Sequence, residues 1–404
     1  MRLLVVSQFY PPAPEGEAVA TWKTVAALAR HGHEVTVVCE RRGPDRGDWW
    51  TLPGVEVEAL PAVPALLPRR AAAQLARLAT GCYWSSWWSW RAARHAVRLA
   101  EARPFDTVIS RTEPASGIVA GRFIAGALRR PWLASINDPH PPFAYPPPYG
   151  PGRPRGLRER RQLRWVARSL HEAAAVIVPC DRLAGWLAGL GALPADVPIA
   201  VIPHAGSVAA STDAPAAASR VTLLHAGTLR LGRGAARLLE IVHAAQAELA
   251  GRATIAVRLL GGIDDEGLTA IGRLGLEGAV TIEPYRALPD SLAAIAGADA
   301  LLVVEADMSE GVFLPSKVSD YALSGRPVLM LSPATGTVAD LAGGLAHPGF
   351  LGQQTEHAAR RLAAFVTRRA AGDPCLDYRL PPIDGMTPER HAARWTGLLT
   401  STRG

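Results

Sequence analysis

The chain has 404 residues, of which 49% are hydrophobic and 20% charged, and its formal net charge is +7. This length predicts two domains, and the composition excludes an intrinsically disordered protein. No apolar run reaches the roughly 18–20 residues of a membrane span. The four cysteines are widely separated, with neither metal-binding nor redox spacing, so we expect a cytoplasmic protein.

The basic residues are almost all arginines, since Lys23 and Lys317 are the only lysines among 43 basic residues. A net positive charge predicts an anionic partner such as a phosphate or a lipid headgroup. Nucleic acid is excluded as a partner because the arginines are scattered and no recognition module is present. A compositional bias toward arginine explains the pattern, and under such a bias each retained lysine is a candidate functional residue.

Short apolar runs alternate with helical patterns along the chain. In the first half this pattern predicts a helix over 18–31 and strands at 3–6, 34–38, 107–110, 132–136 and 175–178. In the second half it predicts strands at 221–225, 256–260, 280–282, 300–304 and 328–331, and helices near 234–249, 289–296, 316–324 and 337–342. Such alternation predicts parallel sheets whose ligands lie at the carboxyl ends of the strands.

The predicted fold class is therefore α/β, with two Rossmann-like domains facing each other across a cleft. We expect an acceptor-side domain over residues 1–204 and a nucleotide-binding domain over 205–385. The expected linker, 205–219, is rich in alanine, serine, threonine and proline. A final helix within 386–404 is expected to pack back on the first domain. The proline-rich stretch 140–154 is expected to be a surface loop.

Two strand-to-helix loops are candidate phosphate sites. The first delivers Gly16 to the start of a helix, where unpaired N–H groups and the helix dipole favour an anion. The second, residues 225–234, contains Gly227 and the cationic donors Arg230 and Arg233. A plain turn is the alternative interpretation of each loop.

The segment 310–328 carries the strongest pattern. Pro315 is expected near a helix start, where Ser316 and Lys317 present hydrogen-bond donors. Asp320 follows Lys317 by three residues on the same helix face. Two interpretations stand: a surface salt bridge, or a site where Lys317 binds a diphosphate and Asp320 accepts the ribose hydroxyls.

These motifs resemble the retaining GT-B glycosyltransferases of family 4. The resemblance extends over nearly the whole chain and is most specific in its last motif. The matching segments are Ser-Gln-Phe-Tyr-Pro-Pro at 7–12, Gly-His-Glu-Val at 32–35, Ile-Pro-His-Ala-Gly at 202–206, Ala-Gly-Thr-Leu at 226–229, Arg-Gly at 233–234, and Pro-Ser-Lys-Val-Ser-Asp-Tyr-Ala-Leu-Ser-Gly-Arg-Pro-Val at 315–328.

The resemblance implies metal-independent transfer of a hexose from a nucleotide sugar, with retention of configuration and no further cofactor. It places Arg233 and Lys317 on the leaving diphosphate, with Gly16, Gly227, Pro315, Ser316 and Asp320 completing the donor site. Asp320 replaces the glutamate usual in this family, which shortens the reach of the carboxylate by roughly 1.5 Å.

Four further residues depart from, or extend, the family pattern. Val312 occupies the place of the family's first glutamate, and Glu310 is a candidate substitute. Asn137 occupies a position that is often histidine, where an amide is able to hydrogen-bond the transferred sugar. Asp138 is a candidate base toward the acceptor. The alternative interpretation is that Asn137 and Asp138 cap a turn.

The acceptor is expected to be a glycan, a lipid-linked glycan or a small molecule. Trp84, Trp87 and Trp88 share a helical face and are followed by several arginines. Tryptophan favours the membrane interface and arginine pairs with anionic lipid, so this face predicts peripheral contact with the inner face of a membrane. A buried aromatic packing helix is the alternative.

Two other functions remain compatible with the sequence. A sugar-nucleotide epimerase of the same fold is one, and a catalytically degenerate GT-B protein that binds a nucleotide sugar is the other. A dinucleotide-dependent dehydrogenase is disfavoured because no Gly-x-Gly-x-x-Gly follows the first strand.

Overall fold

The computed structural model describes residues 1–42, 48–61, 71, 87–112, 115–207, 219–230 and 232–402. The chain divides into two compact units, Met1–Ala205 with Pro388–Gly404, and Gly206–Thr387. We call these units the first and the second domain. Most of the expected linker, residues 208–218, lies outside the described residues.

The first domain is built on a parallel sheet of seven strands in the order β3-β2-β1-β4-β5-β6-β7. Chain order reverses between β1 and β4, which is the point where doubly wound sheets bind ligands at their carboxyl ends. The strands are β1 Arg2–Val6, β2 Glu34–Glu40, β3 Val55–Leu60, β4 Thr107–Thr112, β5 Trp132–Ile136, β6 Ala175–Val178 and β7 Ile199–Val201.

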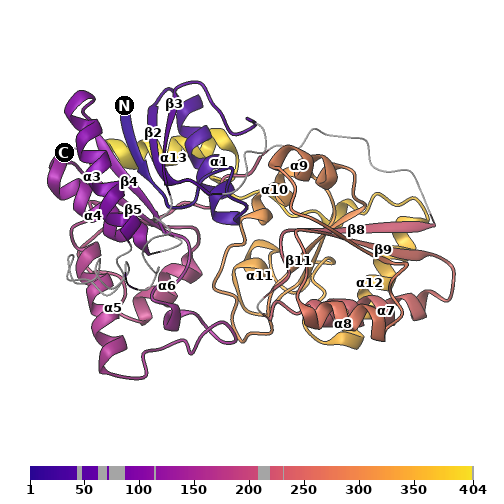
Figure 1. Cartoon of the computed structure of the whole chain (residues 1–404). Helices are drawn as coiled ribbons and strands as arrows, with labels where there is room; N and C mark the ends of the chain where they lie inside the picture. The colour runs from indigo at the N-terminus through magenta and orange to yellow at the C-terminus, as the bar shows by residue number, and fades with distance from the viewer. Residues whose placement is uncertain are drawn as a thin grey trace. The chain divides into compact units, whose positions relative to one another are not determined.

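Helices lie between most of these parallel strands in the chain, the usual connection in a parallel sheet. The C-terminal helix α13 lies beside α1 (Figure 1), where His391 is within 3.2 Å of the Thr24 hydroxyl. The helices of this domain are α1 Gly16–Arg30, α3 Trp87–Ala102, α4 Ser116–Leu128, α5 Leu157–Leu170, α6 Asp181–Gly189 and α13 Pro388–Ser401.

The second domain has a parallel sheet of five strands in the order β10-β9-β8-β11-β12, with its reversal between β8 and β11. The strands are β8 Arg220–Ala226, β9 Thr254–Leu260, β10 Val280–Glu283, β11 Ala300–Val304 and β12 Val328–Leu331. The helices are α7 Ala235–Leu249, α8 Asp265–Arg273, α9 Leu288–Ala296, α10 Lys317–Ser324, α11 Thr337–Leu341 and α12 Thr355–Ala370.

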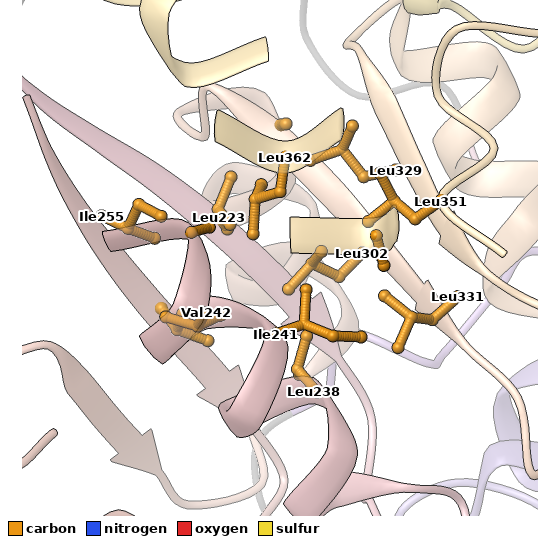
Figure 2. Close-up of a cluster of buried hydrophobic side chains, with 14 of the residues drawn as sticks. Leu223, Leu238, Ile241, Val242, Ile255, Leu302, Leu329, Leu331, Leu351 and Leu362 are labelled. Atoms are coloured by element: carbon orange, nitrogen blue, oxygen red, sulfur yellow. The ribbon is translucent and has the colours of Figure 1, made fainter. Parts of the chain in front are cut away.

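The core of the second domain forms where α7 and α12 cover the sheet. Figure 2 shows Leu238, Ile241 and Val242 of α7 in one cluster with strand residues such as Leu302. Leu362 of α12 belongs to the same fully buried cluster. This apolar packing holds the carboxyl ends of β8 and β11, and the residues just after them, at fixed positions.

Several predicted elements match the structure to the residue, among them β5, β6, β11 and β12. The edge strand β3, whose alternating glutamates leave it only partly buried, is not predicted from the sequence, and neither are several helices between the predicted strands. The prediction of a surface loop over 140–154 is partly wrong. The stretch contains the short 3-10 helix η1 Pro142–Ala144, in which Phe143 and Ala144 are buried. The Ala144 carbonyl accepts a 2.8 Å hydrogen bond from the Trp186 indole.

Candidate active site

The chain enters α10 through Pro315 and Ser316. The Val318 amide donates to the Pro315 carbonyl at 2.9 Å, and Ser316 is the N-cap residue. The predicted helix start at Pro315 is therefore confirmed. Gly325, at φ +65°, ends the helix in a conformation that favours glycine.

Lys317 reaches from the start of α10 to the end of β8. Its Nζ lies 2.8 Å from Nε2 of His225, a fully buried residue. Gly227, at φ +121°, follows directly after β8, and a Cβ atom there would stand 2.9 Å from the Lys317 Nζ. The loop thus requires glycine at 227 both for its backbone conformation and to leave room for the ammonium group.

The charge around Lys317 is positive. Burial lowers the pKa of Lys317 well below its ordinary value, and repulsion from Arg233 lowers it further. Arg233 is exposed, and no hydrogen bond or ion pair joins it to another residue in the described part of the chain. The Lys317 amino group and the Arg233 guanidinium therefore lie near each other, and an anionic ligand between them would favour the protonated form of Lys317.

Glu305 lies just after β11, beside these cations. Burial raises its pKa to about 7, although the hydrogen bond from the Ser332 hydroxyl and the nearby Arg233 both favour the ionised form. A Cβ atom at Gly311 would lie 3.2 Å from each Glu305 carboxyl oxygen. Glu305 is not predicted from the sequence, because only the adjacency of β11 to β8 brings it to the site.

Asp320 and Tyr321 attach α10 to its surroundings. Oδ1 of the buried Asp320 accepts a 2.7 Å hydrogen bond from the Ser207 amide, at the point where the chain enters the second domain. The Tyr321 hydroxyl accepts from the Ala226 amide at 2.9 Å. The structure thus gives Asp320 an anchoring contact that the sequence did not indicate.

The remaining candidates of the second domain are Glu310 and its neighbours. Glu310 is half-buried, and Gly311 after it forms a bridge to Gly336. Val312, at the place of the family's first glutamate, is fully buried, which is favourable for its apolar side chain. No described hydrogen bond links Glu310 to Lys317.

The carboxyl end of the first sheet brings a second set of polar residues together. Gly16 is the first residue of α1, as predicted, and the next residue is Glu17. The Asn137 side-chain amide donates to both Glu17 carboxyl oxygens, at 2.8 and 2.7 Å. Glu17 also pairs with Arg111 of β4 at 3.2 Å, and these two side chains are only 8% and 4% exposed.

Asn137 is therefore held in place by a buried ion pair, rather than merely capping a turn. Asp138 beside it is half-buried. Gly16, Asn137 and Asp138 are predicted candidates, whereas Glu17 and Arg111 are not predicted from the sequence. These lie on different elements, and an isolated glutamate or arginine carries no local signal.

The predicted membrane-facing tryptophans do not form one exposed face. Trp88 is 2% exposed, because α3 packs on α4, so its assignment to a membrane surface is wrong. Trp87 is half-buried with its ring against Trp90, and Trp84 lies outside the described residues. None of the helices described is long and apolar enough to cross a membrane.

Comparison with protein families identifies the first domain. The family described as glycosyl transferase 4-like domain matches residues 15–205. No curated protein sequence matches the chain at the significance required.

Comparison with solved structures identifies the whole fold. Sucrose-phosphate synthase from Thermosynechococcus elongatus matches with a TM-score of 0.61 at 16% identity, covering 99% of this chain and 97% of that one. WaaG, a glycosyltransferase involved in lipopolysaccharide biosynthesis, matches with a TM-score of 0.61 at 15% identity, covering 98% of this chain and 100% of that one. UDP-GlcNAc 2-epimerase from Neisseria meningitidis matches with a TM-score of 0.52 at 11% identity, covering 99% and 100%.

Two parallel α/β domains and these matches define a protein of the GT-B fold, as predicted. Over residues 15–205 the chain is similar to the glycosyl transferase 4-like domain, and this match covers most of the first domain. At these identities the structural matches show the fold alone.

Proposed function

We propose that the protein transfers a hexose from a nucleotide sugar to a glycan, lipid-linked or small-molecule acceptor with retention of configuration. The observation that carries this proposal is the Lys317 ammonium, held between His225 and Gly227 at the carboxyl end of the second sheet. A diphosphate is the ligand whose charge best matches this ammonium and the adjacent Arg233.

In this proposal the negative charge that develops on the departing diphosphate is stabilised by Lys317, by Arg233 and by the start of α10 at Ser316. Such preorganised cations supply the stabilisation that a metal ion provides in other enzymes. Asp320 is assigned to the ribose hydroxyls, and Pro315 and Gly227 shape the loop around the phosphates.

The acceptor side is assigned to the first domain. Gly16, at the start of α1, is the candidate phosphate contact of this domain, because a helix start has unpaired backbone N–H groups. Asn137 is oriented by Glu17 and is assigned to the transferred sugar, and Asp138 is assigned as the base toward the acceptor hydroxyl. Glu310 is the candidate carboxylate on the donor side.

A thermal-shift screen across nucleotide sugars and nucleoside diphosphates tests the donor site. We expect one nucleotide series to raise the melting temperature, and Lys317→Ala to weaken its binding by about 10- to 100-fold, the value of one charge-assisted hydrogen bond. Arg273→Ala is the matched control, because Arg273 pairs with Glu240 on the surface of the same domain. Binding that persists unchanged in Lys317→Ala would overturn the donor-site assignment.

Activity assays separate this function from the two alternatives. Donor hydrolysis or transfer to an acceptor supports a transferase, whereas donor binding with no turnover supports a degenerate binder. An epimerised sugar nucleotide as the product would establish an epimerase instead.

Peripheral membrane contact, the last part of the proposal, is supported by α5 rather than by Trp88. This helix exposes five arginines, Arg158, Arg160, Arg161, Arg164 and Arg168, and three of them surround Trp165. Basic residues near an anionic surface contribute about 1 kcal/mol each.

Replacing Arg161, Arg164 and Arg168 by serine is therefore expected to weaken binding to phosphatidylglycerol vesicles by about 100-fold in a sedimentation assay. The control variant replaces three exposed arginines of the second domain, Arg252, Arg273 and Arg286. Equal binding by both triple variants would exclude α5 as the contact surface.

A further inference from the structure

His225 lies near the end of β8, and its ring is oriented by β11. Its Nδ1 is 2.9 Å from the Leu302 carbonyl oxygen. A carbonyl only accepts hydrogen bonds, so Nδ1 carries the proton in this contact. The tautomer is thereby fixed, and Nε2 presents its lone pair toward Lys317.

The Lys317 ammonium group is the donor in the second contact of the ring, at 2.8 Å. Burial lowers the pKa of His225 well below its usual value, and the charges of Lys317 and Arg233 lower it further, so the ring is neutral. A neutral ring orients the ammonium group without cancelling its charge. An anionic ligand at this position would favour the protonated form of Lys317, whose pKa burial and Arg233 otherwise lower.

We infer that His225 is a positioning residue, which holds the Lys317 ammonium group in the geometry that receives the anionic ligand. The inference rests on the proposed function for the ligand's identity as a diphosphate. Lysine has a long flexible side chain that loses conformational freedom on binding. Ordering it beforehand, with Gly227 leaving space on its other side, removes part of that loss.

Two amide substitutions separate the two contacts of the ring. In His225→Gln the side-chain oxygen reaches the position of Nε2 and still accepts from Lys317. In His225→Asn the side-chain amide takes the position of Nδ1 and donates to Leu302, but offers Lys317 no acceptor. His225→Leu lacks both contacts. If His225→Asn does not fold, His225→Leu takes its place as the variant without an acceptor for Lys317.

The measurement is the affinity for the nucleoside diphosphate that gives the largest thermal shift, determined by calorimetry from pH 6 to pH 10. We expect His225→Asn to bind about 10-fold more weakly and His225→Gln to bind within about 3-fold of the parent. In a Lys317→Ala background, His225→Asn should have no further effect, because the residue acts through Lys317.

The pH profile distinguishes positioning from a general structural role. Affinity should fall as pH rises and Lys317 loses its proton, and this fall should begin at lower pH in His225→Asn, which lacks an acceptor for the ammonium group. An unchanged pH profile and affinity in His225→Asn, with Lys317→Ala still impaired, would overturn the inference alone. Unimpaired binding in Lys317→Ala would overturn the proposed donor site as well.

Discussion

Glu17→Ala is expected to lower the free energy of unfolding of the first domain by about 3–5 kcal/mol. Glu17 and Arg111 form an ion pair whose side chains are 8% and 4% exposed. Removing the carboxylate leaves the Arg111 guanidinium as an unpaired buried charge. It also removes the acceptor of both hydrogen bonds from the Asn137 amide.

The measurement is urea unfolding followed by tryptophan fluorescence and circular dichroism, with both probes compared because two domains need not unfold together. Glu172→Ala is the matched control in the same domain. Glu172 pairs with Arg122, but its side chain is 51% exposed, so we expect a loss below about 1 kcal/mol. Similar losses in the two variants would contradict a specific role for the buried pair.

Glu305→Gln is expected to remove a pH dependence of stability in the second domain. Burial raises the pKa of Glu305 to about 7, whereas an unfolded glutamate titrates near 4.5. Between these values the folded state retains a proton that the unfolded state has lost. Stability therefore falls as pH rises from about 4.5 to about 7, by roughly 3 kcal/mol in all.

Glutamine cannot ionise and still accepts the hydrogen bond from Ser332. The parent and Glu305→Gln should thus have similar stability near pH 4.5, and the variant should be more stable above pH 7. Chemical denaturation at a series of pH values measures this difference. The control, Glu240→Gln, changes a surface carboxylate that pairs with Arg273, and should show no such growing difference. A constant offset between the parent and Glu305→Gln would show that Glu305 is already ionised at the lowest pH.

The elements that the sequence predicted well have strong local signals. Continuous apolar runs such as those of β5, β6, β11 and β12 are long enough to mark buried strands and are flanked by turn residues. The edge strand β3 alternates apolar and charged residues over six positions, which is a weaker pattern. The arginine-rich α5 also lacked the broad apolar face by which a helix is usually recognised.

The residues of the candidate site also differ in how strong a local signal each has in the sequence. Lys317, Asp320, Gly227 and Gly16 were identified because each lies in a local motif with a glycine or proline at fixed spacing. Trp88 was misassigned because helical spacing alone does not say which side of a helix is covered, and α4 covers that side.

The sequence by itself determined the class of the protein: parallel α/β domains, a basic loop after β8, and a retained lysine at the start of α10. Only the tertiary structure decided the partners of these residues. His225 and Lys317 are 92 positions apart, Glu17 and Arg111 are 94 apart, and Glu17 and Asn137 are 120 apart. Periodicity and turn chemistry act within about ten residues, whereas these contacts depend on the strand order that places β8 beside β11 and β1 beside β4.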